Sequence, residues 1–112
     1  ATIDSSKKVK CKSVEINCDP GSFNENDSVQ LAVRPEEIYF QQENQDDNVV
    51  LATIKEIEFL GSFQRVYFEA VSLTDDLIIV DVPSISARKI KLNIDEEMNL
   101  YFSKQDARIY ST

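Results

Sequence analysis

The chain has 112 residues, 42% of them hydrophobic, and its 20 acidic and 12 basic side chains give a net charge of −8. A chain of this length buries about 65% of its unfolded surface, so we expect one folded domain over residues 1–112. The acidic balance argues against nucleic-acid binding, which depends on Lys and Arg next to phosphates. No apolar run approaches the roughly 20 residues of a membrane helix.

The N-terminal quarter of the chain is predicted to hold one bent strand and a loop. Residues 1–7 are small and polar and are expected to fray. In residues 8–18 the apolar positions alternate, but they change phase after Cys11. This change predicts a bulge or bend near Lys12 within one strand. Asp19-Pro20-Gly21 then predicts a turn, followed by a polar loop.

The next segment is an alternating strand that runs into an acidic turn. Residues 29–34 alternate apolar and polar side chains, as in a half-buried antiparallel strand. Pro35 has no N–H for a ladder, and its fixed φ suits the first position of a helical or 3₁₀ turn. Glu36 and Glu37 would lie at the positive end of that turn. We expect Arg34 to pair with one of them, or with the turn's carbonyls, in preference to a ligand.

Residues 49–71 give the clearest hairpin signal in the sequence. Two alternating strands, over residues 49–59 and 63–71, are separated by Leu60 and a turn at Gly61 and Ser62. Glycine adopts positive φ at low cost, so Gly61 is expected to provide the reversal. We expect the aromatic side chains here to pack in the core rather than to stack on bases: Phe59, Phe63, Tyr67 and Phe68.

The C-terminal third is predicted to add further short strands. Residues 77–82 form an apolar strand that Pro83 ends, and residues 84–89 are expected to be irregular. Ile90, Leu92 and Ile94 alternate with polar residues, which predicts another strand. One helical turn over residues 95–98, an extended segment over 100–102 and a closing strand over 107–110 follow. About seven short strands without a long helix predict an all-β barrel or sandwich.

Two motifs in these segments resemble a known family. The first is Val33-Arg34-Pro35-Glu36-Glu37-Ile38, and the second, about twenty residues later, is Glu58-Phe59-Leu60-Gly61-Ser62. Together they resemble the TOBE (transport-associated OB) domain, and the resemblance covers about residues 29–110. It implies an OB-like small β-barrel of short antiparallel strands. The pattern departs from the family at Arg88-Lys89, where a Gly-Asp type turn usually stands.

The resemblance also implies a function. TOBE domains are C-terminal accessory modules of ATP-binding subunits in bacterial ABC importers for polyamines, ferric iron, sugars and oxyanions. This implies a regulatory domain in subunit contact and effector sensing, in the cytoplasm at the inner face of the membrane. Its partners would be a second copy of the ATP-binding subunit and the permease subunits. The alternative is a stand-alone module that binds a small oxyanion.

Within this family, the positions carried over are expected to have structural or interface roles and no catalytic one: Arg34, Pro35, Glu36, Glu37, Phe59, Leu60 and Gly61. ATP and Mg would belong to the parent protein's upstream domain. Gly21 and Gly61 are the only glycines, so no phosphate-binding loop can be drawn here. We therefore expect no enzyme activity and no cofactor in this fragment.

The remaining reactive side chains give no strong site signal. The sequence has no histidine, which argues against Ser–His or Cys–His catalysis and against zinc. Paired carboxylates such as Asp75-Asp76 lack the spacing of a calcium loop. A disulfide between Cys11 and Cys18 would need Cα atoms within about 7 Å, which a bend would allow. The cytoplasmic setting implied by the family favours two reduced thiols instead.

Overall fold

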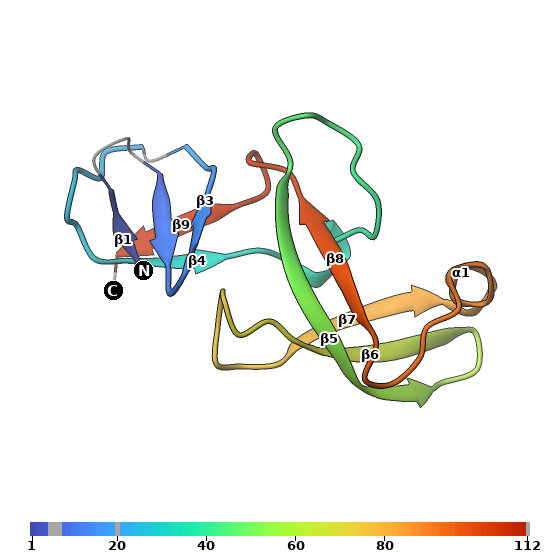
Figure 1. The fold of residues 1–112 in the computed structure, drawn as a ribbon. Coiled ribbons are helices and arrows are strands. Elements are labelled where there is room, and N and C mark those ends of the chain that lie inside the picture. Colours follow the sequence, from blue (N-terminus) through green and yellow to red (C-terminus); the bar gives the residue numbers. More distant parts are fainter. Residues whose placement is uncertain (5–7, 20, 112) are drawn as a thin grey trace.

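A computed structural model describes residues 1–4, 8–19 and 21–111 of the chain (Figure 1). Its described part contains nine strands, one short α-helix and one 3₁₀ turn. In chain order these are β1 (Thr2–Ile3), β2 (Val9–Cys11), β3 (Val14–Ile16), β4 (Val29–Ala32), η1 (Pro35–Glu37), β5 (Asn48–Phe59), β6 (Phe63–Glu69), β7 (Ile78–Pro83), α1 (Ser84–Ile90), β8 (Glu97–Phe102) and β9 (Arg108–Ser111). None of its helices is long and apolar enough to cross a membrane.

The centre of the fold is a curled antiparallel sheet in the order β7-β6-β5-β8. Its long strand β5 pairs with β8 along its first half and with β6 along its second half. The register shifts between Ile54 and Glu56, and this bulge lets the strand bend. Buried side chains alternate along β5 before the bulge: Val50, Ala52 and Ile54. The all-β, OB-like fold and the hairpin expected from the sequence are confirmed.

Two smaller sheets complete the molecule. Strand β4 pairs with β9, and the N-terminal strands form a sheet in the order β1-β2-β3. In Figure 1 this N-terminal sheet lies at one end of the molecule, and β4 runs from it toward the curled sheet. Every strand pair in the three sheets is antiparallel. The core therefore includes side chains from the N-terminal sheet, where Ile3 and Ile16 are buried.

Two expectations about the N-terminal region were wrong. Ile3 is only 1% exposed and lies in β1, so this part of the expected frayed lead-in is core. Residues 5–7 of that lead-in, and Pro20 of the expected turn, lie outside the described residues. The expected single bent strand is a hairpin, because Lys12 adopts a positive φ of 41° and Cys11 pairs with Val14 across the turn. The two cysteines are free thiols, as expected.

The segment between β7 and β8 was also predicted wrongly. Residues 84–90 form α1 instead of irregular structure, and Ile90 ends this helix instead of starting a strand. Lys91 terminates the helix in a left-handed conformation with a φ of 58°, and its N–H donates to the carbonyl of Ala87 at 3.0 Å. The expected helical turn at residues 95–98 is absent from this described segment, because Asp95 turns at positive φ and Glu97 begins β8.

Candidate functional site

The turn that follows β4 is held by contacts within the sequence Arg34-Pro35-Glu36-Glu37. Pro35 opens η1 after Arg34, which is extended with φ −74° and ψ 140°. The main-chain N–H of Glu37 donates to the Arg34 carbonyl at 2.9 Å, and the Arg34 N–H donates to Glu37 Oε1 at 3.2 Å. This reciprocal pair satisfies donors at the start of the turn, as a capping box does. The predicted proline-led turn is therefore present.

The ion pair of this turn differs from the expected one. Arg108 of β9 binds the Glu37 carboxylate through two N–H groups, with Nη1–Oε1 at 2.9 Å and Nη2–Oε2 at 3.3 Å. The hydrogen bond from Arg108, followed by that from the Arg34 main chain, lowers the pKa of Glu37 to about 2. Among the described residues Arg34 forms no ion pair, so the expected pairing of its guanidinium with Glu36 or Glu37 was wrong. No pattern in the sequence predicted that Arg108 would bind Glu37.

The second motif lies at the opposite end of β5 and exposes apolar side chains. Phe59 is 76% exposed and Leu60 is 40% exposed, while Ile85 on the neighbouring helix α1 is 66% exposed. We call these three residues the apolar tip. Phe68, in contrast, is fully buried, and Phe63 and Tyr67 are half-buried. Core packing was therefore the right expectation for Phe68 and the wrong one for Phe59.

Hydrogen bonds attach the start of α1 to the β5–β6 turn. Gly61 turns the chain with a φ of 81°, as expected. The Ser84 hydroxyl donates to the Gly61 carbonyl at 2.8 Å, and the Ser84 main-chain N–H donates to the Ser62 carbonyl at 3.0 Å. These two bonds attach the start of α1, which carries Ile85, to the β5–β6 turn. In Figure 1, α1 accordingly lies where β7 ends and β6 begins, away from the β6–β7 connection.

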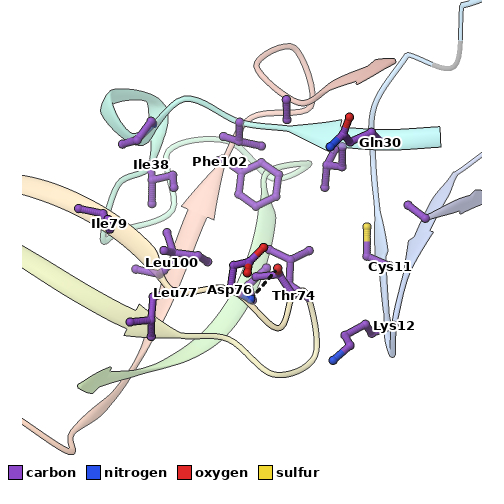
Figure 2. A pocket seen from close by; sticks show the side chains of 18 of the residues that line it. Cys11, Lys12, Gln30, Ile38, Thr74, Asp76, Leu77, Ile79, Leu100 and Phe102 are labelled. Atoms are coloured by element: carbon purple, nitrogen blue, oxygen red, sulfur yellow. Dashed lines mark hydrogen bonds between the residues drawn. The ribbon is translucent and has the colours of Figure 1, made fainter. Parts of the chain in front are cut away.

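A cavity of about 950 Å³ lies between β4 and the chain that enters β7. One wall is the stretch from Val29 to Val33, and the opposite wall runs from Leu73 to Ile79. Figure 2 shows Leu100 and Phe102 of β8 between them, and Lys12 on the N-terminal hairpin. The cavity is lined mainly by apolar side chains. The two motifs did not predict it, because its walls come from segments more than forty residues apart in the chain.

The charged side chains around this cavity do not favour binding of an anion. Among the described lining residues, Lys12 is the one Lys or Arg, and its ammonium already pairs with Asp75. The Asp76 carboxylate also lines the cavity and would repel an oxyanion. No group of three or more His, Cys, Asp or Glu within the described ranges could hold a metal ion. The described residues that line the cavity thus offer mainly apolar contact.

Comparisons with known proteins agree with this description. The family model described as "TOBE domain" matches residues 31–109. Among solved structures, the cytoplasmic molybdate-binding protein ModG, crystallised with molybdate bound, shares the fold with a TM-score of 0.68 at 12% identity. The match covers 80% of this chain and 66% of the ModG chain. No curated protein sequence matches significantly.

Proposed function

We propose that this chain, which belongs to the TOBE domain family, is the accessory domain of an ABC importer's ATP-binding subunit and contributes contacts between subunits. It would act in the cytoplasm at the inner face of the membrane, and ATP and Mg would be bound by another domain of the same protein. Its role there would be regulatory, through contacts between subunits.

The observation that carries this proposal is the apolar tip. Large exposed apolar side chains that lie near one turn are candidates for an interaction surface, and aromatic residues are enriched at such surfaces. Phe59 contributes most, because it is 76% exposed although it belongs to a strand of the central sheet. The bonds from Ser84 attach the start of α1 to the β5–β6 turn, so the backbone that carries these side chains is fixed at that point.

The alternative is a module that binds a small oxyanion, and it is supported by the fold shared with the molybdate-binding protein ModG. At 12% identity this likeness concerns the fold. The large cavity does not favour the alternative, since Lys12 is neutralised by Asp75 and Asp76 adds a negative charge. We therefore place subunit contact first and oxyanion binding second.

A truncation experiment on the full-length ATP-binding subunit distinguishes subunit contact from oxyanion binding. Deleting residues 29–110 should leave basal ATPase activity in place, because no phosphate-binding loop lies in this stretch. Dimerisation and solute-stimulated ATPase activity should both fall, because an interface is lost. Loss of basal ATPase in a folded, dimeric truncated subunit would contradict the accessory role. Unchanged values for all three, with molybdate binding by the isolated chain, would favour the alternative.

A further inference from the structure

One edge of β4 faces the cavity rather than another strand. Strand β4 pairs with β9 on one side only. Main-chain groups alternate sides along a strand, and the N–H of Val29 points away from β9, because it donates to the Ala1 carbonyl. The main-chain groups of Leu31 and Val33 therefore point the same way. In the described chain, neither residue makes a main-chain hydrogen bond outside the strand ladders.

The N-terminus of the chain already occupies the first position on this edge. Thr2 bridges Ser28 in antiparallel orientation, and the Val29 N–H donates to the Ala1 carbonyl at 2.8 Å. Two steps of an antiparallel ladder are thus formed. If the residues before Ala1 continued this strand, they would run along β4. Their next hydrogen-bonded positions would lie opposite Leu31 and then Val33.

The space beside this edge fits an additional strand. The cavity extends from Val29 to Pro35 along β4 and the turn, and its volume is about 950 Å³. The opposite wall carries Leu77 and Ile79, whose side chains are exposed. Figure 2 shows them across the cavity from β4, with the Phe102 ring between. An extended segment here would bury these apolar side chains. It would also form hydrogen bonds with the unpaired main-chain N–H and C=O groups of β4.

We propose that the segment joined to Ala1 in the parent protein adds to β4 as an antiparallel strand and fills this cavity. The proposal rests on the proposed function, in which the ATP-binding domain is connected to this module through Ala1. The added strand would begin beside Pro35 and run toward Ala1. A displacement of the ATP-binding domain would therefore move the chain next to the Arg34-Pro35-Glu36-Glu37 turn. The connection is then a packed strand and not a flexible tether.

Hydrogen exchange at Leu31 and Val33 tests this inference. Both amides should exchange rapidly in the 112-residue chain and roughly tenfold or more slowly in the full-length subunit, because a ladder bond protects an amide. The Val29 amide is the internal reference, since it is bonded to Ala1 in both proteins. Equal exchange rates at Leu31 and Val33 in the two proteins would overturn the proposal.

A second pair of proteins tests the geometry apart from the parent. A five-residue extension of alternating Val and Thr before Ala1 should protect Leu31 and Val33 in the 112-residue chain. The matched control places Pro two residues before Ala1, where its ring would replace the N–H that faces the Leu31 carbonyl and would keep the segment from pairing with β4. This control should protect neither amide. Protection by both extensions, or by neither, would contradict strand addition. Failure here leaves the ATPase and dimerisation results of the truncation experiment untouched, so the two proposals can fail separately.

Discussion

The guanidinium of Arg108 holds both carboxylate oxygens of Glu37, a residue 71 positions earlier in the chain. This contact ties the turn after β4 to β9, the strand that pairs with β4. The Arg34-Pro35-Glu36-Glu37 turn is therefore anchored from both sides, by its own main-chain bonds and by Arg108. The first family motif therefore forms a turn after β4 that Arg108 attaches to β9.

The Glu37–Arg108 pair should make stability depend on pH. The pKa of Glu37 is lowered from 4.5 to about 2, so the folded state favours the charged carboxylate. The resulting stability is fully present above pH 4.5 and is lost as pH falls toward 2. Glu37→Gln should lower the melting temperature at pH 7, and its difference from the wild type should shrink across this window.

The matched control for that variant is Glu36→Gln. Glu36 is exposed, and no described residue forms an ion pair with it. Its substitution should change the melting temperature little at any pH, because an unpaired exposed carboxylate contributes almost nothing. Thermal melts from pH 2 to pH 7 give both curves. Equal losses in the two variants at pH 7 would show that Arg108 does not act through Glu37.

Gly61 should be needed for its backbone conformation and not for space. Its φ is 81°, and a Cβ built there would meet no heavy atom within 4 Å. Gly61→Val should therefore cost on the order of 1–3 kcal/mol through backbone strain alone. Gly61→Asn should cost less, because Asn tolerates positive φ. Urea unfolding of the two variants measures the difference, and equal losses would point to a cause other than φ.

Ile3 should behave as a core residue despite its place near the start of the chain. It is 1% exposed, and Ile→Ala in such a site costs roughly 2–5 kcal/mol. Thr2→Ala, at the exposed neighbour in the same strand, should cost far less. Chemical denaturation compares the two variants. A loss below about 0.5 kcal/mol for Ile3→Ala would mean that β1 does not pack as described.

The parts of the fold that could be predicted are those fixed by local pattern. Alternation over residues 49–59 identified β5 because its buried face, Val50, Ala52 and Ile54, repeats at period two. Gly61 identified the following turn because positive φ favours glycine. Pro35 identified η1 for the corresponding reason, since its φ is fixed. Each of these signals lies within a few residues of the feature it predicts.

The parts that could not be predicted depend on short elements or distant contacts. Helix α1 has seven residues, too few for a period of 3.6 to outweigh the alternation of Ile90, Leu92 and Ile94. The β2–β3 turn uses Lys12 at positive φ, where Asn or Gly would have been the usual signal. Nothing near Glu37 indicated that Arg108 would bind it, and nothing near Gly61 indicated that Ser84 at the start of α1 would donate to its carbonyl.

The apolar tip is the most direct test of the proposed function. Phe59→Ser in the full-length ATP-binding subunit should weaken its self-association by roughly tenfold or more, because a buried aromatic side chain is a frequent interface anchor. The control is Val71→Ser, since Val71 is 69% exposed but lies beyond the far end of β6. Sedimentation equilibrium gives both dissociation constants, and circular dichroism checks that each variant is folded. Weaker association for Phe59→Ser alone is the predicted result. Equal association for wild type, Phe59→Ser and Val71→Ser would contradict the account.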